Sequence, residues 1–227
     1  MGSIDELSLL KKSTLFSELD RKQLEELSEL LLRKIYSQND VLFYQGDPGE
    51  NVFFLKKGKV KALKRSSDGE EQILDIFQRG DVFGEVVLFG VEDYPASAIA
   101  MEEVEVATLS KIAFKNYFYK NPDLGWGMLQ EMARKLRQAQ NKIETLGLKD
   151  TKGRVATLLI DLLYRFGDID SKAVLELNRQ EMANFIGSSR ETVSRTLSDF
   201  KNEGLIEISG NRIYIKDMQG LRSGYID

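Results

Sequence analysis

The sequence predicts an α+β protein built from an antiparallel, jelly-roll-like β-roll, a long helix and a carboxyl-terminal winged helix-turn-helix, in that order. Three observations lead to this prediction. Short apolar runs separated by glycines follow residue 40. A heptad pattern covers residues 129–146. Two short helical patterns that meet at a glycine, followed by a hairpin pattern, occupy residues 178–217.

The β-roll is predicted from five short apolar runs. They are VLFY (41–44), VFFL (52–55), KVKAL (59–63), QILDIF (72–77) and VFGEVVLF (82–89). Strands at this spacing are typical of an antiparallel barrel or roll. Gly46, Gly58, Gly69 and Gly80 lie in the expected turns, where hairpins require positive φ. Gly84 lies inside a strand pattern, which indicates a bulge or a close backbone approach.

A long helix should follow the β-roll. Its apolar positions advance by 3, 4, 3, 4 and 3 residues, which is a heptad seam. The seam residues are Leu129, Met132, Leu136, Ala139, Ile143 and Leu146. These 18 residues would extend about 27 Å at 1.5 Å per residue. Such a stripe either packs on its own domain or forms a coiled-coil interface with a second copy.

The helix-turn-helix is predicted from local signals. Asn178 precedes Glu181 by three residues, which is a capping-box start. Gly187 suits a left-handed helix exit. A second helix should then begin at Ser188 or Ser189. In a helix-turn-helix, the second helix enters the DNA major groove and contacts bases with its first residues.

The second helix should be two-faced. Val193, Leu197 and Phe200 share one stripe, and charged and hydroxyl side chains lie opposite. Downstream, GLIEISGNRIYIKD predicts a β-hairpin around residues 209–211, which would form the wing. Candidate DNA-binding residues are Ser189, Arg190, Glu191, Ser194 and Arg195 on the helix, and Arg212 and Lys216 on the wing.

Arginine and glutamate suit base recognition, because arginine donates to guanine and glutamate accepts from cytosine. Two alternatives remain for this charged face. Glu191, three residues after Ser188, could close a capping box and face the helix end. The whole face could also be merely solvated.

Composition excludes several classes of function. The chain of 227 residues has net charge −4 and contains neither cysteine nor histidine. Disulfides, iron–sulfur clusters, zinc or haem held by Cys or His, and Ser-His-Asp catalysis are therefore excluded. No phosphate loop or nucleophile elbow occurs, so we expect no enzyme. No transmembrane run or signal peptide is seen, and we expect a cytoplasmic protein.

Three motifs resemble the CRP/FNR family of bacterial transcription regulators. They are G-D-x-G-E-x-x-F-F-L-x-x-G-x-V at 46–60, G-D-V-F-G-E-x-x-L-F at 80–89 and R-Q-E-M-A-x-x-I-G-x-S-R-E-T-V-S-R-x-L at 179–197. The resemblance implies a β-roll sensor domain (1–111), a long dimerisation helix (112–148) and a winged helix-turn-helix (149–227). It also implies a homodimer on an inverted-repeat operator in double-stranded DNA. RNA polymerase would be a partner if the protein is an activator.

The resemblance places an effector site at the Gly84-Glu85 pair and in the segment that follows it. Its candidate residues are Gly84, Glu85, Val86, Tyr94, Ala96 and Ser97. Family members that bind cyclic AMP carry an arginine for the phosphate ten residues after the glutamate, and here that position is Pro95. No arginine occurs between residues 80 and 110, so the strongest phosphate contact would be missing. We therefore expect an unidentified small-molecule effector other than cyclic AMP, or none; Gly84 and Glu85 could also serve the fold alone.

Two function classes remain open at this stage. The first is a sequence-specific, DNA-binding transcription regulator. The second is a ligand-binding regulatory module whose winged helix contacts protein instead of DNA. Residues 149–227 hold 12 basic and 12 acidic residues and are not basic overall, so DNA binding would have to rest on the local placement of Arg190, Arg195, Arg212 and Lys216.

Overall fold

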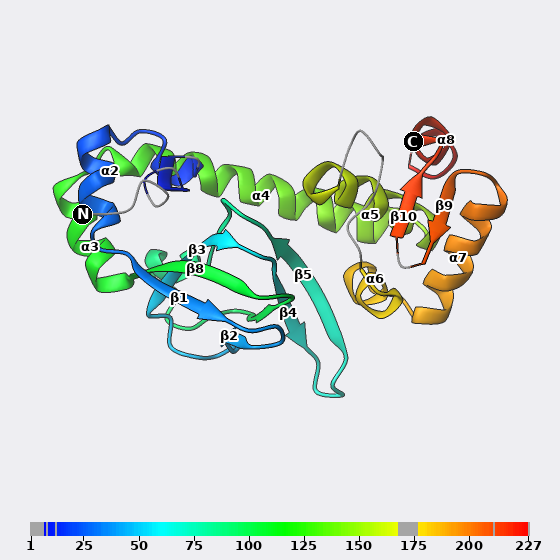
Figure 1. Ribbon diagram of the computed structural model, residues 1–227, viewed down its shortest axis with the longest axis horizontal. Coiled ribbons are helices and arrows are strands. Elements are labelled where there is room, and N and C mark those ends of the chain that lie inside the picture. Colours follow the sequence, from blue (N-terminus) through cyan, green and yellow to red (C-terminus); the bar gives the residue numbers. More distant parts are fainter. Residues whose placement is uncertain (1–6, 8, 12, 168–176, 211, 227) are drawn as a thin grey trace. The chain divides into compact units, whose positions relative to one another are not determined.

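The computed structural model describes residues 7, 9–11, 13–167, 177–210 and 212–226 (Figure 1). The chain forms two compact units. The first consists of residues 1–64 and 74–137, and the second of residues 65–73 and 138–227. No helix within the described ranges is both long and apolar enough to cross a membrane.

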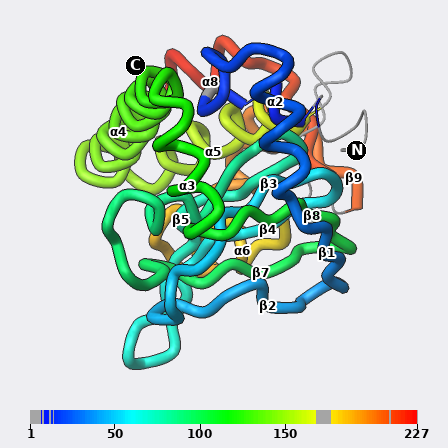
Figure 2. Tube along the Cα trace, turned by 90° about the vertical axis from the view of Figure 1, so that its left-hand side faces the viewer, coloured from blue at the N-terminus to red at the C-terminus, as the bar shows by residue number. Residues whose placement is uncertain are grey.

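Two four-stranded sheets form the predicted β-roll, and their strands lie next to one another in both views (Figures 1 and 2). One sheet has the order β1 (Leu32–Tyr36), β8 (Val104–Ser110), β3 (Asn51–Lys57) and β6 (Val82–Phe83). The other has the order β2 (Val41–Phe43), β7 (Ser97–Ala100), β4 (Val60–Arg65) and β5 (Glu71–Phe77). Neighbours in these sheets pair antiparallel, as in β3 with β8 and β4 with β7. The predicted fold class is confirmed.

The last predicted strand is wrong in part. Of residues 82–89, only Val82 and Phe83 form a strand, and η2 (Glu85–Phe89) is a 3₁₀ helix. Gly84 separates them with φ +73°, in the left-handed region. A Cβ there would lie 3.3 Å from Phe53 and from Tyr94. The expected close backbone approach is confirmed, and the chain turns instead of bulging.

The interior between the sheets is rich in aromatic rings. Phe53 and Phe83 stack at 5.2 Å, Phe77 and Phe83 at 4.9 Å, and Phe43 and Tyr94 at 3.8 Å. Branched and small side chains fill the rest of this cluster: Leu55, Val60, Val87, Ala98, Ala100, Val104 and Val106.

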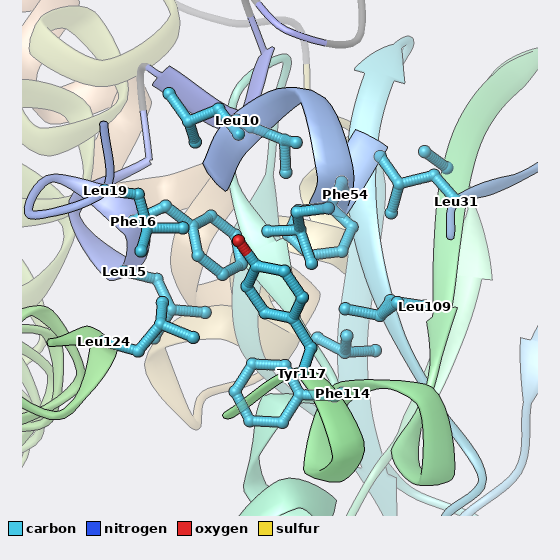
Figure 3. Close-up of a cluster of buried hydrophobic side chains, with 14 of the residues drawn as sticks. Leu10, Leu15, Phe16, Leu19, Leu31, Phe54, Leu109, Phe114, Tyr117 and Leu124 are labelled. Atoms are coloured by element: carbon cyan, nitrogen blue, oxygen red, sulfur yellow. The ribbon is translucent and has the colours of Figure 1, made fainter. Parts of the chain in front are cut away.

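A second core lies between the outer face of one sheet and the helices that cover it (Figure 3). The covering elements are η1 (Thr14–Phe16), α2 (Arg21–Ser28), α3 (Lys111–Lys120) and the start of α4 (Leu124–Leu148). Phe16 and Phe54 pack with their ring centroids 5.6 Å apart. Tyr117 donates a hydrogen bond to the carbonyl of Gln23 at 2.6 Å, which ties α3 to α2.

The range 112–148, predicted as one long helix, holds two. α3 ends at Lys120, and α4 begins at Leu124 after the Asn-Pro-Asp sequence. Proline cannot donate a backbone hydrogen bond within a helix, and it disfavours helical backbone in the residue before it. The 25 residues of α4 extend about 37 Å, longer than the seam alone required.

The second unit contains the carboxyl-terminal domain. Its elements are the end of α4, α5 (Thr151–Phe166), α6 (Arg179–Ile186), α7 (Arg190–Asn202), β9 (Ile206–Ser209), β10 (Arg212–Ile215) and α8 (Met218–Tyr225). The hairpin of β9 and β10 is antiparallel, with Arg212 opposite Ser209, so the predicted wing is confirmed. Asn211, in the predicted turn, lies outside the described residues. α5 contacts α6, α7 and α8, and it thus forms the centre of this domain.

Candidate functional site

The turn between α6 and α7 has the geometry that the sequence predicts. Asn178 caps α6 in a complete capping box with Glu181. Gly187 ends α6 with φ +64°, and the backbone N–H of Ser188 donates to the carbonyl of Ala183 at 3.0 Å. This is the Schellman arrangement that lets a chain leave a helix sharply. Ala183 is completely buried, as a close helix crossing requires.

Each face of α7 has a different environment. Val193, Leu197 and Phe200 are at most 1% exposed. Arg190, Glu191 and Arg195 are exposed, and their side chains have no hydrogen bond or ion pair to any described residue. Ser194, between them, is half-buried. The predicted division of α7 into a packed and an outward face is therefore present.

The amino-terminal cap of α7 decides between the two roles considered for Glu191. Ser189 is the N-cap, and its hydroxyl accepts a hydrogen bond from the backbone N–H of Thr192 at 3.2 Å. Thr192, not Glu191, therefore holds the third position of the helix. The alternative in which Glu191 closes a capping box from Ser188 is wrong, and Glu191 points outward from the first turn.

The wing residues lie in a different setting. Arg212 begins β10 and is exposed, and Lys216 directly follows the strand. The Nζ of Lys216 lies 3.0 Å from a carboxylate oxygen of Glu207 on β9, and both side chains are more than half exposed. The pairing of Lys216 with Glu207 was not predicted from the sequence. A phosphate that contacts Lys216 would have to compete with Glu207.

Of the predicted effector residues, Gly84 caps η2, Glu85 and Val86 lie in it, and Tyr94 lies next to Gly84. Glu85 is the first residue of η2 and is 4% exposed. Tyr94 and Ala96 are buried, and Val86 and Ser97 are half-buried. The hydroxyl of Ser97 accepts a hydrogen bond from the backbone N–H of Gln45 at 2.9 Å, so it holds the loop before β3.

Tyr94 is held in the fold by its hydroxyl group and by its ring. Its hydroxyl donates to the carbonyl of Asn51 at 2.7 Å and accepts from the backbone N–H of Asn51 at 3.1 Å. Burial raises the pKa of Tyr94, although its backbone hydrogen bonds act in the opposite direction. With its ring stacked on Phe43, this tyrosine has the contacts of a structural residue.

Lys135 is a member of this site that sequence reasoning missed. Its ammonium group donates to a carboxylate oxygen of Glu85 at 2.6 Å and to the carbonyl of Val82 at 3.4 Å. The side chain of Glu85 is 5% exposed and that of Lys135 26%. A lysine at a position flanking the heptad seam gives no sequence signal for this pairing, because long-range contacts depend on how α4 lies along the β-roll.

The seam residues of α4 are largely uncovered in the single chain. Leu129, Leu136 and Ile143 are 63%, 62% and 71% exposed. Ala139 is also exposed, and Met132 and Leu146 are half-buried. An apolar stripe of this regularity on one helix is typical of a helix–helix interface.

No group of three or more acidic side chains in the described ranges is arranged to hold a metal ion. Cysteine and histidine, the usual ligands of transition metals, do not occur in the chain.

Two family models match the chain. The cyclic nucleotide-binding domain matches residues 33–121, and the Crp-like helix-turn-helix domain matches residues 153–223. Among curated proteins, a CRP-like cAMP-activated global transcriptional regulator of Mycobacterium tuberculosis is 30% identical, over 94% of this chain and 96% of its own. The cyclic AMP receptor protein of Thermus thermophilus is 28% identical, over 92% and 94%.

Solved structures show the same similarity. FixK2 from Bradyrhizobium japonicum has a TM-score of 0.77 at 26% identity, over 85% of this chain and 96% of its own. A CRP/FNR-family transcriptional regulator from Thermus thermophilus has a TM-score of 0.71 at 25% identity, over 85% and 97%. The similarity thus covers both the β-roll and the helix-turn-helix.

Proposed function

The chain belongs to the CRP/FNR family of DNA-binding transcription regulators, and we propose that it acts as a homodimer that reads an inverted-repeat operator through α7. It is a regulator and not an enzyme, as composition predicts. The observation that carries the proposed reading mode is the outward face of α7. There, two arginines and a glutamate lie opposite a fully buried stripe, and none of the three has a side-chain partner among the described residues.

Base recognition follows from the chemistry of that face. A guanidinium group donates two hydrogen bonds to O6 and N7 of guanine, and a carboxylate accepts one from N4 of cytosine. Arg190, Glu191 and Arg195 lie within six residues at the start of α7, the part of a recognition helix that faces base edges. Ser189 and Ser194 add hydroxyls for phosphates or bases. Arg212 and Lys216 would contact the phosphate backbone from the wing.

Dimerisation is proposed through the α4 seam. Leu129, Leu136 and Ile143 leave an apolar stripe that a second α4 would cover in a parallel coiled coil. A two-fold dimer presents two copies of α7 to two half-sites, about 34 Å apart along one face of the duplex. This arrangement matches an operator with inverted-repeat symmetry.

The effector proposed is a small molecule other than cyclic AMP, or none. Two of the similar proteins are named for cyclic AMP, and the matched domain is a cyclic nucleotide-binding domain. In this chain, however, Pro95 stands where the resemblance calls for the phosphate-binding arginine. By the same resemblance the carboxylate of Glu85 would accept the ribose hydroxyl, but here it is held by Lys135. A cyclic nucleotide would thus lack the arginine contact to its phosphate, and its ribose would have to displace Lys135 from Glu85.

The remaining parts of the proposal follow from DNA binding. A regulator of transcription contacts the bacterial chromosome, so we place the protein in the cytoplasm. RNA polymerase is the expected partner if the protein activates its targets.

Selection of bound duplexes from a random DNA pool tests this function, performed with and without a metabolite extract from cells. We expect an enriched inverted repeat in at least one condition. Enrichment in only one of the two would show that an effector controls DNA binding. Absence of any enriched sequence in both would contradict the proposal.

A further inference from the structure

Arg154 connects three segments of the carboxyl-terminal unit. It lies in the first turn of α5. Its Nη2 donates to the carbonyl of Leu146 at 2.7 Å, and its Nε donates to the carbonyl of Lys149 at 3.0 Å. Its Nη1 donates to the carbonyl of Ile186 at 3.4 Å. One guanidinium therefore contacts the end of α4, the α4–α5 junction and the end of α6.

The first two contacts stabilise the junction between α4 and α5. The last four carbonyls of a helix have no partner within that helix, and Leu146 is among them in α4. A cation there also interacts favourably with the negative end of the helix dipole. Only Lys149 and Asp150 separate the two helices, so a residue that bonds both sides of this short junction restricts the direction in which α5 leaves α4.

The third contact reaches the turn that leads into α7. Ile186 is the last residue of α6, and Gly187 and Ser189 follow as the helix end and the next helix cap. The carboxyl-terminal half of α7 is held to the start of α5 by an ion pair of 2.8 Å between Asp199 and Lys152. The direction of α7 relative to the carboxyl-terminal half of α4 thus depends on contacts that Arg154 makes.

Arginine suits this position better than any other side chain. Its planar group carries five N–H donors in a fixed fork, so it can donate to three carbonyls that lie in different directions. Lysine keeps the charge, but its ammonium group is a single point at the end of a flexible chain. A lysine at position 154 would therefore retain part of the attraction and lose the fixed geometry.

We propose that Arg154 is a positioning residue that fixes the direction of α7 relative to the end of α4, and thereby selects the spacing between operator half-sites. The spacing part rests on the proposed homodimer. In a two-fold dimer joined through α4, a change in the direction of α7 moves the two recognition helices in opposite senses. One base pair corresponds to about 3.4 Å and about 35° along the duplex, so small changes in direction alter the preferred spacing.

The positioning is tested within one chain by spin labels. Because the chain has no cysteine, Gln138→Cys on α4 and Lys201→Cys on α7 give two unique and exposed labelling sites. Labelled chains are diluted with unlabelled protein, and pulsed electron resonance measures the distance between the two labels. We expect a narrow distribution with Arg154 and a broader or displaced one with Arg154→Lys and Arg154→Gln. Arg165→Lys, on the same helix and paired with Asp161, is the matched control.

The spacing is tested with a series of operators whose half-sites are moved apart or together by one and two base pairs. For the parent chain we expect affinity to fall about tenfold or more when the two sites can no longer be bound together. For Arg154→Lys the affinity lost on changing the half-site spacing should shrink to about threefold. Its affinity for a single half-site should stay within about twofold of the parent's. Arg165→Lys should behave as the parent does.

Two results would overturn the inference: a label distribution that Arg154→Lys leaves unchanged, or a broadened distribution with the spacing preference intact. Circular dichroism checks that each variant is folded. If Arg154→Gln does not fold, Arg154→Lys decides the test, since it keeps the charge and most of the side chain. A monomeric parent chain in sedimentation would defeat the proposed dimer and the spacing part with it, and the label distances would still decide whether Arg154 positions α7.

Discussion

The carboxylate of Glu85 and the ammonium group of Lys135 form an ion pair of 2.6 Å that joins η2 to the middle of α4. The carboxylate is nearly inaccessible to water, whereas the lysine keeps about a quarter of its surface exposed. Burying a charge is favourable only when a partner compensates it. Lys135 therefore links the site where the resemblance places an effector to the helix that carries the apolar seam.

Removal of Lys135 should destabilise the fold. In Lys135→Met the Glu85 carboxylate stays buried without its partner, and we expect a loss of about 2–3 kcal/mol, below the ~3–5 typical of a fully buried pair because Lys135 is partly exposed. Adding Glu85→Gln should restore part of the loss, since a neutral amide needs no counter-charge. Urea denaturation of the parent, the two single variants and the double variant measures the coupling energy between Glu85 and Lys135. Arg21→Met, which breaks the exposed Arg21–Glu25 pair, should cost under about 0.5 kcal/mol. Additive single effects would mean that the two side chains are not coupled.

Cyclic AMP should leave the thermal melting temperature and DNA binding unchanged. A ligand of the folded state adds RT ln(1 + [L]/Kd) to stability, which is about 2.7 kcal/mol at 100 Kd. The cyclic AMP receptor protein of Thermus thermophilus serves as the positive control. Clear stabilisation of this chain by micromolar cyclic AMP would contradict the argument from Pro95 and from the occupied Glu85.

A charge in the middle of the seam should separate the two subunits. Leu136 is 62% exposed in the single chain, and a glutamate there would place two like charges against each other in a parallel coiled coil. We expect Leu136→Glu to shift the protein towards monomer in sedimentation and to weaken operator binding, because two half-sites are no longer bound together. Gln138→Glu, on the same helix but outside the seam, should remain dimeric. An unchanged dimer for Leu136→Glu would show that another face mediates association.

Acid should weaken the β-roll through Glu105. Burial alone would raise the pKa of this carboxyl, but hydrogen bonds and ion pairs from Lys56 and Arg33 hold it below the ordinary value of 4.5. A lowered pKa in the folded state gives stability that is present above the unfolded value and is lost as pH falls through the folded one. The parent should therefore lose more stability below about pH 4.5 than Glu105→Gln does. Urea unfolding at several pH values measures the difference, with Glu103→Gln as the exposed control.

Local signals predicted much of the fold, and the exceptions have physical reasons. The capping box at Asn178 and the left-handed Gly187 depend on neighbouring residues, so the sequence could reveal them. β1 could not be recognised in the same way, because four of its five residues are exposed and apolar Leu32 and Ile35 do not alternate with polar ones. Helix α8, with two glycines in eight residues, owes its helical form to packing. There, the ring of Tyr225 packs at a tilt against Phe200 of α7, and its hydroxyl donates to Glu203.

In the candidate site, too, local pattern predicted some residues and missed the partners that only the fold brings together. The outward face of α7 follows from helical periodicity, so Arg190, Glu191 and Arg195 were found. Lys135 and Glu207 were missed, since each becomes a partner only when a distant or cross-strand residue is brought beside it. Residues 1–111, 112–148 and 149–227 remain a predicted division of domains, and the break at Asn121 to Asp123 refines the middle part.

Arg195 should carry base discrimination, whereas the wing should carry general affinity. Arg195 is exposed on α7 without a partner among the described residues, and a bidentate contact with guanine is worth about 1–3 kcal/mol. Arg195→Ala should therefore cost that amount per half-site and relax the preference at one G·C pair. Binding profiles across all single-base changes in the operator measure both effects. Arg212→Ala should instead weaken all sequences alike and lower the salt dependence, as loss of a phosphate contact does. Lys216→Ala should also weaken all sequences alike, with a loss limited by Glu207, which already neutralises part of that charge. A uniform loss for Arg195→Ala, with every base preference intact, would identify Arg195 as a phosphate contact and would assign base reading to another residue of α7.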